Sequence, residues 1–90
     1  MTLKNLGNAY YGLGFLDQAI SLYKKFIEDN FDDEVYYNLA GCLYLIGELG
    51  EAQRAMELAL GAQPDNRDYL ELQNQITHSS RTILNSMRNR

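Results

Sequence analysis

The sequence is poor in cysteine, proline and positive charge, and each shortage excludes a class of protein. Its one cysteine, Cys42, allows neither an internal disulfide framework nor a cysteine-based zinc site. Eight basic against twelve acidic residues give a net charge of −4, whereas a dedicated nucleic-acid binder carries a basic face for phosphates. No apolar run approaches the roughly 18–20 residues of a membrane span, and no signal-peptide pattern follows Met1. We therefore expect a cytoplasmic protein that binds neither nucleic acid nor membrane.

The remaining composition is that of a small all-α protein. A length of 90 residues allows one domain. The chain is 46% hydrophobic and 22% charged, close to ordinary globular usage, which argues against intrinsic disorder. The single proline and the supply of Leu, Ala, Glu and Gln favour helices.

The sequence contains an internal repeat with a period of 33 residues. Identities and similarities concentrate at small and apolar positions, where a repeated packing geometry requires them. The pairs that coincide include Asn5 with Asn38, Leu6 with Leu39, Tyr11 with Tyr44, Gly14 with Gly47, and Ala19 with Ala52. We therefore expect two copies of one structural unit.

Each copy shows apolar residues at helical spacing in two successive segments. These segments are 3–13 and 16–27 in the first copy, and 36–46 and 49–60 in the second. A glycine separates the two segments of each copy, and so short a connection predicts an antiparallel helix pair. At the crossing of each pair, small residues are expected to face each other: Gly7 and Ala40 against Ala19 and Ala52.

These residues resemble the tetratricopeptide repeat, whose signature runs Trp-x2-Leu-Gly-x2-Tyr, then Ala-x3-Phe, then Pro, over about 34 residues. The first copy matches with Leu3, Leu6, Gly7, Tyr10, Ala19 and Tyr23, and the second with Tyr36, Leu39, Ala40, Leu43, Ala52, Met56 and Pro64. The chain departs from the pattern by lacking tryptophan and by having Phe26 where a small residue is usual. The resemblance implies a right-handed α-α superhelix, with repeats at 1–33 and 34–66.

Residues 67–90 have a different pattern and predict a C-terminal capping helix. Asp65 or Asn66, after Pro64, is expected to begin it as N-cap. One face of this helix is apolar, with Tyr69, Leu72, Ile76, Ile83 and Met87. Because the ends of stacked repeats need a cover, we expect this face to pack on the second repeat.

No residue set predicts catalysis, a cofactor or a metal site. His78 has no acidic residue three or four positions away, and Cys42 is expected to be a buried small hydrophobe. Five acidic residues surround the turn between the repeats, without the spacing of a calcium loop. They are Glu28, Asp29, Asp32, Asp33 and Glu34, and we expect a solvated turn in which Asp33 caps the following helix.

The resemblance places function in a concave groove lined by the first helix of each repeat, which in the family holds a partner peptide or helix. Tyrosines there offer rigid amphipathic area, asparagines can bond a ligand backbone, and glycines leave room for close approach. Carried over position by position, the groove residues are Lys4, Asn8, Tyr11, Gly12, Tyr37, Asn38, Gly41, Tyr44 and Leu45. The resulting prediction is a non-catalytic interaction module or adaptor for a partner protein segment.

Some family members grip a chaperone's C-terminal carboxylate with Lys and Asn on the first repeat, Asn on the second, and Lys and Arg on the third. Lys4, Asn8 and Asn38 match the first three positions. The third-unit positions fall near Asp68 and Leu72, which supply no positive charge. An aspartate there would repel a carboxylate, so a complete clamp is not expected.

The alternative prediction is a self-associating scaffold element. Ile83, Leu84 and Met87 extend past the point where two repeats can cover them, and could pack on the first repeat of a second copy. The arginines of the tail, Arg81, Arg88 and Arg90, could meet acidic residues there. Because repeat arrays usually need about three units, the first repeat is expected to be covered by another copy or continued in a longer protein.

Overall fold

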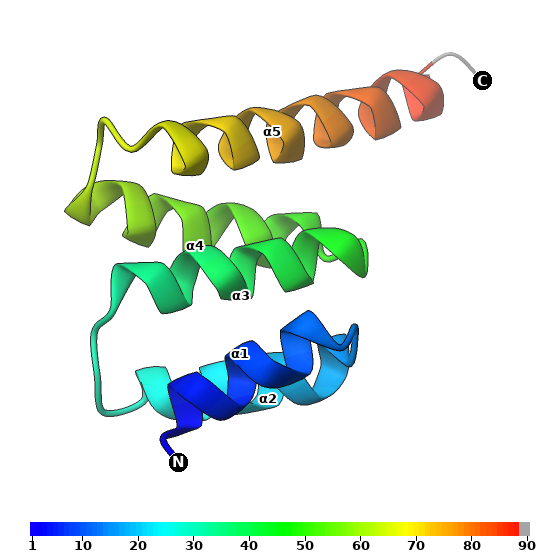
Figure 1. Ribbon diagram of the computed structural model, residues 1–90. Coiled ribbons are helices and arrows are strands. Elements are labelled where there is room, and N and C mark those ends of the chain that lie inside the picture. Colours follow the sequence, from blue (N-terminus) through cyan, green and yellow to red (C-terminus); the bar gives the residue numbers. More distant parts are fainter. Residues whose placement is uncertain (89–90) are drawn as a thin grey trace.

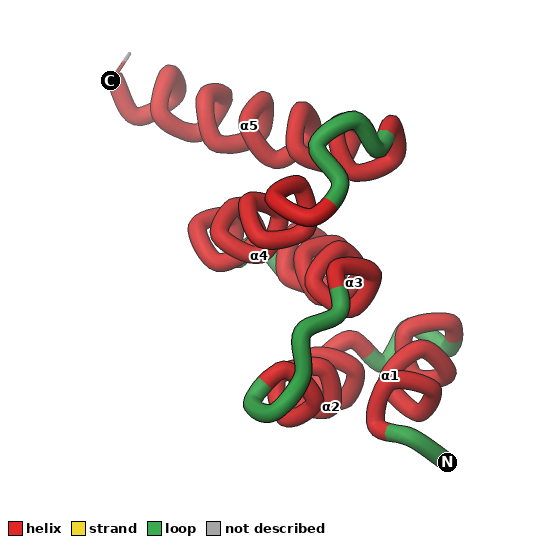
Figure 2. Tube along the Cα trace, turned by 90° about the vertical axis from the view of Figure 1, so that its left-hand side faces the viewer, coloured by secondary structure: helices red, strands yellow, loops and turns green. Residues whose placement is uncertain are grey.

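The computed structural model describes residues 1–88 and shows an all-α helical repeat, as predicted. The described part contains five helices: α1 (Leu3–Gly12), α2 (Leu16–Ile27), α3 (Asp33–Leu45), α4 (Leu49–Ala62) and α5 (Arg67–Arg88). Helices α1 and α2 form one layer, α3 and α4 the next, and α5 lies on the outside of α4 and α3 (Figures 1 and 2). The prediction that Arg90 belongs to a contacting tail lies outside the described residues.

Both helix pairs turn through the same glycine motif. Gly14 and Gly47 have φ of 83° and 87°, a left-handed conformation that glycine adopts without a Cβ penalty. The amide of each glycine bonds the carbonyl three residues back, and the next amide bonds the carbonyl five residues back. These bonds are Gly14 N–Tyr11 O, Phe15 N–Tyr10 O, Gly47 N–Tyr44 O and Glu48 N–Leu43 O. This is the Schellman arrangement, so the two glycines that separate the segments in sequence also end the helices in space.

Three helices begin at side-chain caps, one of which differs from the prediction. Thr2 accepts a hydrogen bond from the amide of Asn5, and Asn66, one of the two expected candidates, accepts from Tyr69. Helix α3 is capped by Asp32, whose Oδ1 accepts from the amide of Val35 at 3.2 Å. The prediction that Asp33 caps this helix is wrong. The backbone of Asp32 is extended (φ −153°, ψ 111°), as an N-cap requires, whereas Asp33 is already helical.

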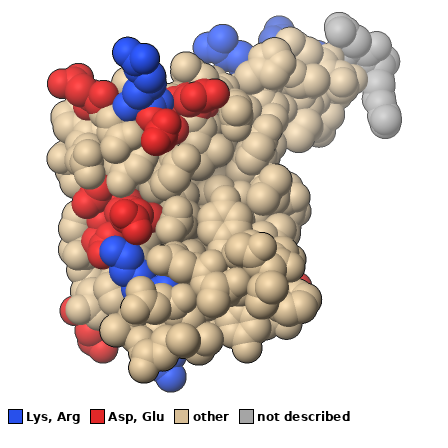
Figure 3. All heavy atoms as spheres, viewed as in Figure 1, with Lys and Arg blue, Asp and Glu red and all other residues tan. Residues whose placement is uncertain are grey.

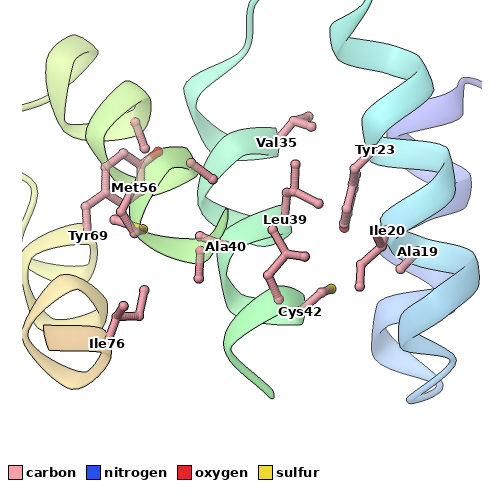
Figure 4. Close-up of a cluster of buried hydrophobic side chains, with 14 residues drawn as sticks. Ala19, Ile20, Tyr23, Val35, Leu39, Ala40, Cys42, Met56, Tyr69 and Ile76 are labelled. Carbon is pink, nitrogen blue, oxygen red and sulfur yellow. The ribbon is translucent and has the colours of Figure 1, made fainter. Parts of the chain in front are cut away.

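One hydrophobic core runs through all three layers (Figure 4). Tyr23 of α2 and Cys42 of α3 are fully buried in its first half, and Met56 of α4 and Ile76 of α5 in its second. Burial of Cys42 confirms the prediction that it acts as a small hydrophobe. Because every layer contributes to this cluster, the hairpins and α5 stabilise one another, as expected for stacked repeats.

The small residue of α1 makes room for an aromatic ring. A Cβ built on Gly7 would lie 2.7 Å from Cε1 of Tyr23. The neighbour that limits the size of residue 7 is therefore Tyr23, whereas the sequence suggested Ala19. Both Tyr23 and Ala19 belong to α2, one helical turn apart. The sequence therefore predicted the packing of α1 on α2, but not the contact between Gly7 and Tyr23.

Helix α5 covers the stack with its first half only. Tyr69 and Ile76 are buried, whereas Ile83, Leu84 and Met87 are 52%, 58% and 67% exposed. The expectation that the whole apolar face packs on the second repeat is therefore wrong for Ile83 and Met87, because the helix is longer than the stack it covers. The C-terminal half of α5 projects past the ends of α3 and α4 (Figure 1). Within residues 1–88, no helix combines the length and apolarity that a membrane span requires.

Candidate binding groove

Three helices form the walls of a hollow of about 340 Å³. Helix α1 contributes one tyrosine, α3 contributes two tyrosines with a glycine and a leucine, and α5 contributes a mixed polar and acidic wall. The lining residues are Tyr11, Tyr37, Gly41, Tyr44, Leu45, Asp68, Glu71, Leu72 and Gln75. A site of this size with an aromatic floor suits a few side chains of a bound segment.

Two further hollows continue this one at either end. Asn8, Tyr11, Gly12 and Asn38 line one of about 320 Å³. Tyr44, Leu45, Gly47, Leu49, Ser79 and Ile83 line the other, of about 360 Å³. Because Tyr11 is shared on one side, and Tyr44 and Leu45 on the other, the three hollows form one continuous surface, here called the concave groove. Figure 3 shows a recess below the projecting end of α5. The surface visible inside this recess is uncharged.

Eight of the nine groove residues predicted from the sequence line the concave groove, and Lys4 does not. The Nζ atom of Lys4 lies 2.8 Å from Oδ2 of Asp32 and 3.6 Å from Oε1 of Glu34. The hydrogen bond to Asp32 raises the pKa of Lys4, so the lysine is held in its charged form by neighbours within the chain. Lys4 thus ties α1 to the start of α3.

Asn8 and Asn38 bond each other across the first and second repeats. Oδ1 of Asn8 accepts from Nδ2 of Asn38 at 3.1 Å and also from the hydroxyl of Tyr23. Burial, the main cause, raises the pKa of Tyr23 to about 12, which keeps this hydroxyl a donor. The side-chain NH2 group of Asn8 and the side-chain carbonyl oxygen of Asn38 have no hydrogen-bond partner within residues 1–88. Both side chains line the 320 Å³ hollow, where these two groups can bond a ligand backbone.

Gly41 packs against a tyrosine of the protein itself. A Cβ built on Gly41 would lie 2.7 Å from the hydroxyl oxygen of Tyr11. The expectation that this glycine leaves room for a ligand is therefore wrong, because Tyr11 occupies the room. Burial raises the pKa of Tyr11, as expected for a hydroxyl packed against α3. Among residues 1–88, nothing outside the backbone of α1 lies within 4 Å of a Cβ built on Gly12, so that position does leave space.

Helix α5 supplies the groove residues that the sequence reasoning missed. Asp68 and Glu71 lie three residues apart and therefore on one face of α5, opposite the tyrosines of α3. Burial, with added repulsion from Asp68 and Glu71, raises the pKa of Tyr37. The signal was present in the sequence, since the third-unit positions fall near Asp68 and Leu72. These positions served only as evidence against binding of a ligand carboxylate, because residues 67–90 were interpreted as a capping helix and not as a wall of the groove.

The two residues considered for other chemistry lie outside the groove lining. His78 is exposed on α5. Burial raises the pKa of the Cys42 thiol to about 11, so it is a poor nucleophile. In the part of the chain that the structure describes, no three His, Cys, Asp or Glu side chains are grouped so that they could hold a metal ion.

Comparison with known proteins identifies the repeat. The family model for the tetratricopeptide repeat matches residues 10–76. A solved structure described as the first TPR of Spaghetti (RPAP3) bound to the HSP90 peptide SRMEEVD is similar to 86% of this chain, over 89% of its own length. Its sequence identity is 20% and its TM-score is 0.45. No curated protein matches the chain.

Proposed function

The chain belongs to the tetratricopeptide-repeat family, a protein-interaction fold, and from that premise we propose that its concave groove binds a segment of a partner protein. The protein would act as a non-catalytic adaptor. The observation that carries this proposal is the continuity of the groove over α1, α3 and α5. A single continuous surface of this kind suits an extended or helical segment better than a small molecule.

The groove is built to bind without rearranging. Tyr11 is held against Gly41, and Tyr37 stacks on Tyr69 with ring centroids 4.7 Å apart. A tyrosine has two rotatable side-chain bonds, so it offers contact area at low entropic cost. Because these rings are already positioned, most of the ordering cost of binding falls on the ligand segment.

Polar recognition is expected at the α1 end of the groove. The unpaired amide of Asn8 and the unpaired carbonyl of Asn38 provide one donor and one acceptor, which match the carbonyl and amide of a peptide backbone. This pair gives the ligand direction and register, while the tyrosines provide the contact area.

Tyr44→Ala tests the proposal, because Tyr44 lines two of the three hollows. The probes are 12-residue peptides recovered from a random phage-displayed library panned on the intact chain. We expect Tyr44→Ala to weaken their binding by about tenfold, since a tyrosine anchor typically contributes more than 1 kcal/mol. Fluorescence anisotropy measures the affinity, and circular dichroism checks the helix content.

Tyr36→Ala is the matched control, since Tyr36 is also a half-buried tyrosine of α3 but lies outside the groove. Its peptide affinity should equal that of the unmodified protein. Equal affinity of all three proteins would exclude the groove as the binding site. Asn38→Ala is a less clean test, because it also removes the bond to Asn8.

Self-association is a second candidate, carried by the exposed apolar side chains on the projecting half of α5. Ile83, Leu84 and Met87 are all more than half exposed, and Leu13 and Phe15 are exposed at the opposite layer. We propose that these two surfaces join in a head-to-tail contact between copies. Exposed apolar side chains grouped on one helix segment are typical of interaction sites.

The test compares the solution mass of the chain with that of Ile83→Lys/Met87→Lys across a concentration series. Light scattering should show a species larger than 10.3 kDa for the unmodified chain and a monomer for the variant. Leu58→Lys/Leu70→Lys is the control, because these exposed leucines lie on α4 and the covered half of α5. A monomer at every concentration of the unmodified chain would rule out self-association.

A further inference from the structure

The concave groove has charge of one sign only. Asp68 and Glu71 are its two charged lining residues, and none of the residues that line its three hollows is Lys or Arg. Within residues 1–88, neither carboxylate takes part in an ion pair; the pairs that form involve Lys4 and Lys24. Two unpaired carboxylates therefore face the groove with no positive side chain of the lining to offset them.

The carboxylates lie opposite the tyrosines that line the other wall. Tyr11, Tyr37 and Tyr44, from α1 and α3, line the same 340 Å³ hollow as Asp68 and Glu71, from α5. Repulsion from both carboxylates contributes to the raised pKa of Tyr37, so their field reaches the aromatic wall. A tyrosine face attracts a guanidinium or ammonium group, and a facing carboxylate adds a charge-assisted hydrogen bond. Aromatic and acidic walls together are thus complementary to one long basic side chain.

The same arrangement disfavours an acidic segment. A ligand carboxylate would face Asp68 and Glu71, and the lysine of α1 cannot compensate, because Lys4 is bonded to Asp32 and lies outside the lining. Like charges brought together at a partly desolvated surface oppose binding. The groove therefore favours a basic ligand segment over an acidic one.

We propose that the occupant of the concave groove is a partner segment bearing arginine or lysine, whose basic side chain enters between Tyr37 and Tyr44 on one wall and Asp68 and Glu71 on the other. Apolar residues beside it pack on Leu45 and Leu72. This assignment rests on the proposed function, and it adds the chemical class of the partner.

The first experiment reads the composition of the bound peptides. A random library of 12-residue peptides is panned on the intact chain, and the recovered sequences are compared with the unselected library. We expect arginine and lysine to be enriched next to apolar residues, and the affinity of the recovered peptides to fall as NaCl increases. Recovery of neutral or acidic peptides that still depend on Tyr44 would overturn the inference and leave the proposed function standing. Recovered peptides whose binding ignores Tyr44→Ala would overturn both.

The second experiment reverses the charge. D68K/E71K should lower the affinity for basic peptides by about tenfold or more, and raise it for peptides in which glutamate replaces each basic residue. D29K/E57K makes the same change in net charge at exposed positions outside the groove, and should leave both affinities nearly unchanged. D68N/E71Q keeps the side-chain shapes and should give an intermediate loss, which separates charge from any damage to α5. Equal affinities in D68K/E71K and D29K/E57K would overturn the inference.

The third measurement separates a partner segment from a second copy of this chain, whose own α5 carries Arg81 and Arg88. Light scattering of R81E/R88E is compared with that of the unmodified chain. The inference expects no change in mass and unchanged binding of basic peptides. Loss of an oligomer together with a gain in peptide affinity would show that the groove is filled by a neighbouring copy, and would overturn the assignment to a separate partner.

Discussion

The hydroxyl of Tyr69 donates a 2.7 Å hydrogen bond to Oδ2 of Asp33, a residue 36 positions earlier in the chain. The side-chain amide of Gln63 donates to the same oxygen. Burial and the Asp33 carboxylate raise the pKa of Tyr69, so the phenol remains a donor. This contact fixes the start of α5 to the first turn of α3, and thereby sets the distance between the two walls of the concave groove.

Tyr69→Phe is expected to destabilise the protein while the ring keeps its packing. The change removes a partly buried hydrogen bond to a charged group, and such bonds typically contribute about 1.5–3 kcal/mol to the free energy of unfolding. Urea unfolding followed by circular dichroism measures this loss. Tyr36→Phe serves as control, because its hydroxyl makes no hydrogen bond within residues 1–88, and it should change the free energy by less than about 0.5 kcal/mol. Equal stabilities of the two variants would contradict a structural role for the bond.

The contact also predicts a pH dependence at acid pH. The Tyr69 hydrogen bond, with that of Gln63, lowers the pKa of Asp33 below its ordinary value of 3.8. Between the folded and unfolded pKa values the unfolded chain binds more protons, so the contribution of Asp33 is complete above about pH 4 and is lost as pH falls through the folded pKa. The difference in unfolding free energy between the unmodified protein and Asp33→Asn should therefore shrink with falling pH. A constant difference from pH 7 to about pH 2 would refute this linkage.

Gly7→Ala is expected to destabilise the protein although alanine is the better helix former. The new methyl would lie 2.7 Å and 2.9 Å from two ring carbons of buried Tyr23. Overpacking of this kind costs about 1–3 kcal/mol, more than the gain of about 1 kcal/mol from helix propensity. At Gly50 a Cβ would meet no atom of residues 1–88 within 4 Å apart from the backbone of its own helix, so Gly50→Ala should instead be neutral or stabilising. Thermal unfolding that ranks the two variants in the opposite order would contradict the contact.

Gly41→Ala is expected to alter binding more than stability. The new methyl would meet only the hydroxyl end of Tyr11, which can swing away at a cost of about 0.5–1.5 kcal/mol. The higher helix propensity of alanine, worth about 1 kcal/mol, offsets this cost. Swinging moves Tyr11 within the groove, so peptide affinity should fall severalfold while the unfolding midpoint stays close to that of the unmodified protein. Adding Tyr11→Phe removes the clash and should restore part of the affinity. If the double variant binds no better than Gly41→Ala, the seating of Tyr11 on Gly41 is not what shapes the groove.

The reactivity of the Cys42 thiol is expected to follow the global unfolding of the protein. Its side chain is fully buried, and burial raises the pKa of its thiol to about 11, so the reactive thiolate is scarce in the folded state at neutral pH. Reaction with a disulfide reagent should follow the unfolding equilibrium as urea is added. Rapid reaction of the native protein, at the rate of an exposed thiol, would show that the α3 core opens locally.

The sequence by itself determined the periodic features of this protein. The 33-residue spacing predicted two helix pairs, because a repeated pattern of small and apolar residues requires a repeated packing geometry. Gly14 and Gly47 marked the ends of helices, since few other residues tolerate a positive φ there. The burial of Cys42 also followed from its position in the pattern. These features are local, or repeat at a fixed distance, so sequence reasoning reaches them. The exposure of Ile83 and Met87 did not follow from the expected capping face, which is covered only as far as Ile76, and agrees instead with the alternative prediction.

The tertiary structure decided which polar groups remain available for binding. Lys4 was expected in the groove, but its charge is bonded to Asp32, which the chain brings close only when α1 packs beside α3. Gly41 was expected to receive a ligand and instead receives Tyr11. Asp68 and Glu71 became a groove wall because α5 packs against α3 and α4, where Tyr69 reaches Asp33. Contacts between residues about 30 or more positions apart depend on side-chain direction after packing, and a hydrophobic pattern encodes which face is buried but not which polar groups meet there.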